Sequence, residues 1–366
     1  MDLDNVLSGN FRRLEGGLWS DVPLWIPTGA VSLDYAIGGF SGRRGGIPLG
    51  KVSIISGDVS SGKSSLLDHV MRNMLNLGGI VILGDPEDSH GESRMREIGI
   101  GKDAQFLVMD PPENADELDE FPQLCLEDFF VVMDDSLRKI RKEDPDVPVL
   151  YALDSLASID MRENLIAGGG FEKRDKMNEE QMRTKYLSQK LRSMDAYLSR
   201  ANAALVIVNQ LREKPGVSFG DPRYEPGGKA VMFHSALLVR LNGGSFITAK
   251  DDPTRKHKID KDAVGISCNF FIKKNKVGRP HAKGTFPLYY DERGILHAEC
   301  LVDLIEDREK HKDDDTPLSK EGNTYLWYGE KMGVRKKFIQ TLCERPDLAT
   351  EIEEELFLNQ ESTEGE

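Results

Sequence analysis

Residues 57–64 of the chain, GDVSSGKS, follow the pattern Gly-x-x-x-x-Gly-Lys-Ser that binds phosphate groups. Its glycines let the backbone wrap around an anion, with amide N–H groups turned inward at the N-terminus of the next helix. Lys63 supplies a positive charge for the β- and γ-phosphates, and the Ser64 hydroxyl is a candidate Mg²⁺ ligand. The pattern predicts a nucleoside triphosphate site formed by Gly57, Asp58, Val59, Ser60, Ser61, Gly62, Lys63, Ser64 and Ser65.

Acidic residues at the ends of two apolar stretches can complete this site. Asp154 ends the stretch 147–154, a position from which a carboxylate orients Mg²⁺, in this case through a bound water. A second stretch ends at Asp85, and a carboxylate beside the phosphates can polarise the attacking water. Asp85, Glu87 and Asp88 compete for that role, so the residues alone leave the base open.

Alternating strands and helices are expected to position these groups. The expected strands are short apolar runs at 51–57, 80–85, 147–154 and 203–210. The expected helices lie at 64–79, 125–141 and 178–200, and the chain finishes with helical sequence at 335–357. Continuous apolar strands that alternate with helices are typical of a parallel sheet covered on both faces.

The charge composition of the chain does not decide whether it binds nucleic acid. The net charge of −14 argues against nucleic acid binding. Lys and Arg nevertheless concentrate at 181–200 and 272–283, where a local basic surface can bind DNA.

The sequence shows no apolar run of membrane-spanning length and no signal-peptide pattern, so we expect no membrane partner. Four scattered cysteines fit a reducing cytoplasm, the expected location.

Long polar segments at 160–177 and 211–229 contain several glycines, and 251–262 is also a candidate loop. Such segments after sheet strands are often binding loops, although plain surface loops are the alternative. The last twenty residues, 347–366, hold eight acids and no Lys or Arg. They act either as a DNA mimic that competes with DNA or as a solubilising tail.

Residues 209–241 resemble the strand-end glutamine and second DNA-binding loop of the RecA recombinases. The likeness continues in family order over about 29–350, through SLDYAIGG (32–39), GDPE (84–87), LDSLAS (153–158), KKNK (273–276) and YGEKMGVRKKF (328–338). It implies an α/β fold: a RecA-type P-loop NTPase core with a mostly parallel central sheet, plus a small C-terminal α+β domain. The implied division is a protomer-linking N-terminal segment (1–28), the ATPase core (29–290), the small domain (291–350) and an acidic tail (351–366).

The resemblance assigns catalytic roles to four side chains. Glu87 matches the family's catalytic base, and Gln210 matches the glutamine that senses the γ-phosphate of ATP. Lys274 and Lys276 match a pair that reaches the γ-phosphate of the neighbouring protomer, as trans-acting cations do. Taken without the family, KKNKVGRP would be a solvated basic turn.

For DNA, the resemblance points to Arg212, Gly227 and Gly228 in the second loop, and to Lys185, Ser188 and Arg192 on the preceding helix. Spacings of three and four put the last three on one helical face. Such a face can bind phosphates without reading sequence, although a solvated helix surface is the plainer alternative.

The chain departs from the family pattern in four places. Arg94 stands where many members stack a tyrosine on adenine, and it is retained as a candidate ATP-binding residue. Pro215 replaces a large aliphatic residue that the second loop wedges between bases. The first loop, 160–177, carries extra charge, and the region before residue 29 lacks a clear match. These departures indicate a divergent member, of the bacteriophage type.

The sequence therefore predicts an ATP- and Mg²⁺-dependent recombinase that forms a homo-oligomeric helical filament on single-stranded DNA and pairs it with double-stranded DNA. Single-strand-binding and mediator proteins are candidate partners, and a bacterial or phage-infected cytoplasm is the expected place of work. A ring-forming RecA-fold helicase and a non-catalytic ATP-binding mediator are the alternatives. The loop at 211–229 disfavours the first, and the joint presence of Lys63, Glu87, Asp154 and Gln210 disfavours the second.

Overall fold

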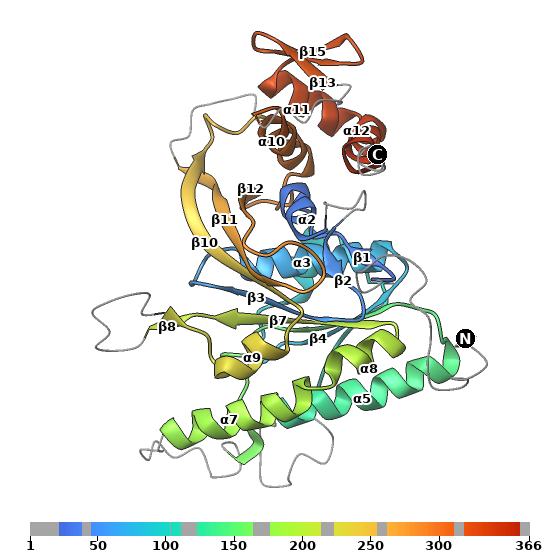
Figure 1. The fold of residues 1–366 in the computed structure, drawn as a ribbon, viewed down its shortest axis with the longest axis vertical. Helices are drawn as coiled ribbons and strands as arrows, with labels where there is room; N and C mark the ends of the chain where they lie inside the picture. Colours follow the sequence, from blue (N-terminus) through green and yellow to red (C-terminus); the bar gives the residue numbers. More distant parts are fainter. Residues whose placement is uncertain are drawn as a thin grey trace, which may run out of the picture.

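The computed structural model describes residues 22–38, 45–102, 104–110, 123–163, 176–213, 223–254, 262–310 and 318–358. Their main feature is an eight-stranded sheet in the order β12–β11–β10–β3–β7–β6–β4–β5 (Figure 1). The strands are β3 (Val52–Gly57), β4 (Ile80–Gly84), β5 (Phe106–Val108), β6 (Val149–Leu153), β7 (Ala203–Gln210), β10 (Leu237–Thr248), β11 (Ala263–Asn275) and β12 (Lys283–Tyr289). Neighbours from β10 to β5 pair in parallel, and β10, β11 and β12 pair antiparallel. The predicted mostly parallel α/β sheet is confirmed.

Helices bury both faces of this sheet, which explains why its central strands are mostly apolar and almost completely buried. Ile54 and Ile55 point to opposite faces of β3, and neither is exposed to solvent. One face packs on α2 (Val31–Gly38) and α3 (Lys63–Asn76), and the other on α5 (Leu126–Glu143), α7 (Lys176–Leu191) and α8 (Met194–Arg200) (Figure 1).

The helix expected over 178–200 is two helices, so that prediction was wrong. The chain turns at Ser193, and α8 then buries Met194 and Leu198 against the sheet. Asp195 Oδ1 accepts a hydrogen bond of 3.0 Å from the Val52 backbone N–H at the start of β3. The break therefore turns α8 onto the strand that leads to the phosphate loop.

Shorter elements surround the ends of the main strands. They are β1 (Trp25–Ile26), β2 (Ile47–Pro48), α4 (Glu92–Glu97), β8 (Arg212–Glu213), β9 (Arg223–Tyr224) and α9 (Gly228–His234). β8 and β9 pair antiparallel at the base of segment 214–222 and form its stem. The stem is followed directly by α9, which packs on α7.

A small α+β region completes the described chain. It contains α10 (His297–Lys310), the three-stranded sheet of β13 (Leu318–Glu321), β14 (Thr324–Trp327) and β15 (Glu330–Val334), and the helices α11 (Arg335–Glu344) and α12 (Pro346–Leu358). Arg335 ties α11 to α10 through carboxylates of Glu299, Asp303 and Glu306. The expected helical finish is two helices, because Pro346 cannot continue α11 and instead begins α12.

Several predictions concern segments outside the described residues. They are most of the N-terminal segment (1–21), most of the first loop (164–175), the tip of the second loop (214–222, with Pro215), the candidate loop at 255–261, and the end of the acidic tail (359–366). Within the described part of the chain, no helix has the length and apolar character needed to cross a membrane.

Candidate functional site

The phosphate loop lies between β3 and α3, as its sequence predicts. Gly62 precedes α3 with φ of 87°, and a Cβ there would lie 3.0 Å from both Cys268 Sγ and Leu288 Cδ2. At Gly57 a Cβ would come within 2.4 Å of the Leu241 carbonyl oxygen. Glycine is therefore required at both positions by close packing, and at Gly62 also by the left-handed backbone. Together they turn the chain so that α3 begins at the loop.

Lys63 is nearly buried at the floor of this loop, with 6% of the residue exposed. Its Nζ donates a 2.5 Å hydrogen bond to the Asp58 carbonyl oxygen. Burial lowers the pKa of Lys63, while the nearby carboxylates of Asp154, Asp58 and Glu87 act in the opposite direction. A phosphate anion in the loop would compensate for the desolvation of this ammonium group.

Asp154 follows β6 and faces the first turn of α3. It is 4% exposed and accepts a hydrogen bond from the Ser64 side chain, and burial raises its pKa. Among the described residues, none donates a hydrogen bond to its Oδ2 atom. A hydroxyl and a carboxylate with spare acceptor capacity beside a phosphate loop form an oxygen donor set that suits Mg²⁺.

Glu87, which follows β4, contacts Gln210 at the end of β7, although β6 lies between these two strands. Glu87 Oε1 accepts hydrogen bonds from Ser155 Oγ at 2.8 Å and from Gln210 Nε2 at 3.4 Å. Glu87 is exposed, so water can reach its carboxylate. Asp85, in contrast, is occupied: its Oδ2 accepts a 2.8 Å hydrogen bond from the His90 backbone N–H. Of the competing acids, Glu87 is thus the one joined to Gln210.

A buried histidine behind the site was missed by the sequence reasoning. The side chain of His90 has no solvent exposure, and its Nδ1 lies 3.2 Å from Asp85 Oδ2. Its Nε2 lies 3.2 Å from Asp68 Oδ1 and 3.7 Å from Asp154 Oδ2. Burial opposes the charge on the imidazole, but its close contacts with the carboxylates of Asp68 and Asp85 outweigh burial and raise the pKa of His90 to about 9. No local pattern signals this contact, because Asp68 lies on α3 and His90 follows β4.

Arg94 also contacts Asp68. Its Nε and Nη2 atoms donate hydrogen bonds of 2.9 Å and 2.5 Å to Asp68 Oδ2, while 40% of the Arg94 side chain stays exposed. Arg94 and His90 are four residues apart in the chain, and they contact the two carboxylate oxygens of Asp68: His90 contacts Oδ1 and Arg94 contacts Oδ2. The guanidinium is thereby held beside α3.

Lys274 and Lys276 lie at the end of β11, against α9 and α8. Lys274 Nζ donates to the Met232 and Phe233 carbonyl oxygens at 2.7 Å and 2.8 Å, at the C-terminus of α9. Burial, together with the charge on Lys276, lowers the pKa of Lys274 to about 8. Lys276 is half exposed, with its Nζ 3.9 Å from Asp195 Oδ2.

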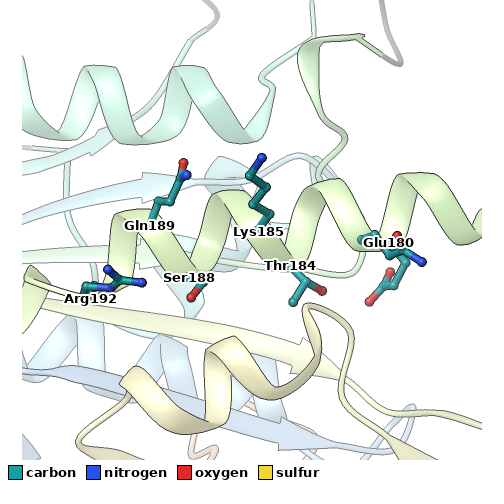
Figure 2. A pocket seen from close by; sticks show the side chains of 7 residues that line it. Glu180, Thr184, Lys185, Ser188, Gln189 and Arg192 are labelled. Carbon is teal, nitrogen blue, oxygen red and sulfur yellow. The ribbon is translucent and has the colours of Figure 1, made fainter.

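The predicted DNA residues on α7 line an open groove of about 550 Å³. Its lining consists of Glu180, Gln181, Thr184, Lys185, Ser188, Gln189 and Arg192, the last lying just beyond the end of α7. Figure 2 shows Thr184 and Ser188 pointing toward the segment that contains α9, and Lys185 and Gln189 pointing away from it. The structure therefore brings the predicted residues into one groove, with Lys185 turned outward.

The predicted loop glycines adjoin the same helix. The Gly227 backbone N–H donates a 2.9 Å hydrogen bond to Glu180 Oε1, and a Cβ on Gly228 would lie 3.2 Å from Thr184 Oγ1. Arg212 is exposed and its Nη2 donates to the Ala157 carbonyl oxygen at 3.1 Å, close to the end of β6. The stem thus contacts the segment after Asp154 through Arg212, and the glycines that follow the stem contact α7.

Comparison with known proteins agrees with this arrangement. A family model described as the RecA N-terminal domain matches residues 146–296. Protein RecA of Rhodococcus opacus (strain B4) is 30% identical over 353 residues, which cover 96% of this chain and 87% of that protein. Protein RecA of Leifsonia xyli subsp. xyli is 29% identical over 332 residues, covering 90% of this chain and 80% of that protein. With its P-loop, its strand-end Asp154 and a likeness that spans almost the whole chain, the protein belongs to the RecA family.

Proposed function

We propose that this protein is an ATP-dependent recombinase that forms helical filaments on single-stranded DNA and catalyses homologous pairing and strand exchange in recombination and repair. The observation that carries the proposal is the contact between Glu87 and Gln210, because Gln210 is the register partner of Gly57 in the phosphate loop and lies two residues before the stem formed by β8 and β9. Relatives named Protein RecA, matched over most of their length, support the same activity.

In this proposal the chain hydrolyses ATP with the side chains that surround the phosphate loop. Loop amides and Lys63 would bind the phosphates, and Ser64 and Asp154 would hold Mg²⁺, the latter through water. The metal would neutralise charge on the phosphate oxygens. Glu87 polarises the attacking water, and Gln210, hydrogen-bonded to Glu87, links the state of the phosphates to the loop that begins at Leu211.

Lys274 and Lys276 act across the protomer interface in the proposed filament. Their contacts with the C-terminus of α9 and with Asp195 hold them at the end of β11. Supply of cations by a neighbour makes hydrolysis depend on assembly, because an isolated protomer lacks part of the charge that stabilises the transition state.

The DNA surface of the proposal combines the α7 groove with the loop stem. Lys185, Ser188 and Arg192 contact the phosphate backbone, together with Arg212 and the backbone N–H groups at Gly227 and Gly228. These groups bind phosphates of any sequence, which suits pairing guided by the bases themselves. Arg94, which is paired with Asp68, is the proposed contact to the adenine in place of the tyrosine that many family members have.

We also propose the domain boundaries, the subfamily, the partner proteins and the location in the cell. They are the division at residues 28, 290 and 350, the bacteriophage-type placement, single-strand-binding and mediator partners, and work in the cytoplasm of a bacterium or phage-infected host. The departures at Arg94 and Pro215 support divergence within the family.

A strand-exchange assay tests the proposed function. The purified protein, ATP and Mg²⁺ are incubated with circular single-stranded DNA and homologous linear duplex, and joint molecules are resolved on a gel. We expect joint molecules with homologous duplex only, and none with Lys63→Ala. Closed rings in electron micrographs together with unwinding of duplex, without homologous pairing, would instead identify a helicase.

A further inference from the structure

Glu225 is a buried carboxylate at the end of the stem. It follows β9, precedes Pro226 and Gly227, and is 6% exposed. Its Oε1 atom lies 3.3 Å from Arg240 Nη2 and 3.3 Å from Lys273 Nζ, and it accepts a 3.4 Å hydrogen bond from Ser56 Oγ. A buried acid needs such cationic partners because desolvation disfavours its charge. Glu225 thus joins the stem to three strands of the central sheet.

Two of the residues that contact Glu225, Ser56 and Arg240, lie on the strands next to the start of the phosphate loop. Ser56 immediately precedes Gly57, the first residue of that loop. Arg240 is the register partner of Ser56 in the parallel pair of β10 and β3. The Glu225 carboxylate therefore lies over the two strands that hold the start of the phosphate loop.

On the interface side, Glu225 contacts the strand that carries the two proposed trans-acting lysines. The β10–β11 register passes from Leu238 opposite Lys274 to Val239 opposite Ile272, so Lys273 is the extra residue of a β-bulge. Lys273 contacts Glu225, and the adjacent Lys274 caps the C-terminus of α9. Two successive lysines thus hold both ends of the segment 225–234.

On the DNA side, the same segment is tied to the α7 groove and to β7. The Gly227 N–H donates to Glu180 on α7, and Asn209 Nδ2 donates a 3.0 Å hydrogen bond to the Pro226 carbonyl oxygen. Asn209 is fully buried and precedes Gln210, whose side chain contacts Glu87. The segment that begins at Glu225 therefore contacts the strand before the phosphate loop, the strand that ends in Gln210, and the α7 groove.

We propose that Glu225 is a positioning residue that couples nucleotide binding to DNA binding through the loop stem. It touches neither ATP nor DNA, and acts by holding the loop stem on the phosphate-loop strand and on the bulge beside Lys274. A shift of either strand is transmitted to the stem because one carboxylate joins them. This inference rests on the proposed function and goes beyond it, since it assigns the coupling to one side chain.

The test measures coupling rather than activity. Anisotropy of a labelled single-stranded oligonucleotide gives the DNA dissociation constant of the full-length protein without nucleotide and with adenylyl imidodiphosphate and Mg²⁺. The DNA dissociation constant without nucleotide, divided by the constant with the analogue, measures the coupling between nucleotide binding and DNA binding. By reciprocity, the analogue's affinity must change by the same factor when unlabelled oligonucleotide is added. We expect Glu225→Gln to lower the ratio by about fivefold or more while affinity for the analogue without DNA stays within about twofold.

Two further variants keep the test decisive. Lys273→Gln leaves the Glu225–Arg240 pair in place, so we expect it to fold even where Glu225→Gln does not, and it should lower the ratio in the same direction. Asp252→Asn is the matched control, because Asp252 is a fully buried carboxylate paired with Arg293 at 2.9 Å, away from the loop stem. It should leave the ratio unchanged.

The outcomes separate the two proposals. A wild-type ratio near one would overturn the proposed function and this inference together. A large wild-type ratio that persists in Lys273→Gln and in any folded Glu225→Gln would overturn the inference alone. An equal loss in Asp252→Asn would also overturn it, because general destabilisation would then account for the effect.

Discussion

Gln210 Nε2 lies 3.4 Å from Glu87 Oε1, so the last residue of β7 contacts the acid that follows β4. The two residues are 123 positions apart in the chain. Ser155 Oγ holds the same carboxylate oxygen at 2.8 Å. Any displacement of Glu87 by a bound phosphate would therefore also displace Gln210, and the stem begins two residues beyond it.

Glu87→Gln should retain ATP and DNA binding but reduce turnover by about 100-fold or more, because the amide cannot accept a proton from water. Phosphate release in the presence of single-stranded DNA measures turnover, and analogue binding checks the site. Asp88→Asn is the matched control, since Asp88 is also exposed and adjacent. Turnover within a few fold of wild type in Glu87→Gln would move the role to Asp85 or Asp88.

Replacing Lys274 and Lys276 together by alanine should abolish DNA-stimulated ATPase while isolated protomers still bind nucleotide. Mixing this variant with Lys63→Ala should restore some activity, because certain mixed interfaces pair an intact P-loop with intact lysines. Phosphate release across a series of mixing ratios measures the effect. No recovery at any ratio, with DNA binding of the mixed filaments verified, would indicate a structural role at the C-terminus of α9.

His90 should make the nucleotide-free protein less stable as pH rises. Its pKa is raised to about 9 from an ordinary 6.5, so the folded state binds more protons between these values. Its stabilising contribution is complete below pH 6.5 and is lost as pH rises through 9, at most about 3 kcal/mol. Lys274, with its lowered pKa, has the opposite trend above pH 8, so the comparison must be with a variant.

The measurement is urea unfolding at pH 6.5 and at pH 9, for wild type and His90→Gln without nucleotide. Glutamine keeps a hydrogen-bond donor but does not titrate. Wild type should lose more free energy of unfolding over this interval than the variant does. Identical losses in both proteins would show that the pKa of His90 is not raised in the folded state.

The acidic C-terminus should slow binding to duplex DNA at low salt if it mimics DNA, because salt screens exposed charges. Ile352, Leu356 and Phe357 are buried in α12, so ending the chain before them would damage the small domain. The clean test ends the chain after Leu358, which removes three acids, and separately adds Glu351→Gln, at an exposed position of α12. Stopped-flow association should be modestly faster for the first variant and faster still for the combination. Equal rates at low salt for all proteins would leave the tail as a solubiliser.

Much of the nucleotide site follows from the sequence alone, because it depends on neighbours in the chain. Gly57, Gly62, Lys63 and Ser64 lie in one motif between a strand and a helix, and this local order brings them together in one loop that suits an anion. Continuous apolar runs predict buried parallel strands, and the structure has β3, β4, β6 and β7 where those runs lie. The position of Asp154 after such a strand also predicts its place beside Ser64.

Contacts that depend on the order of strands within the sheet were decided only by the tertiary structure. Because β3 lies between β10 and β7, residues far apart in the chain converge on it, and Glu225 reaches Ser56, Arg240 and Lys273. No sequence pattern predicts that Glu225 or His90 is buried, because a single acid or histidine outside a motif is usually a surface residue. Their roles come from burial among charges supplied by other elements, and burial of this kind is a property of packing rather than of local sequence.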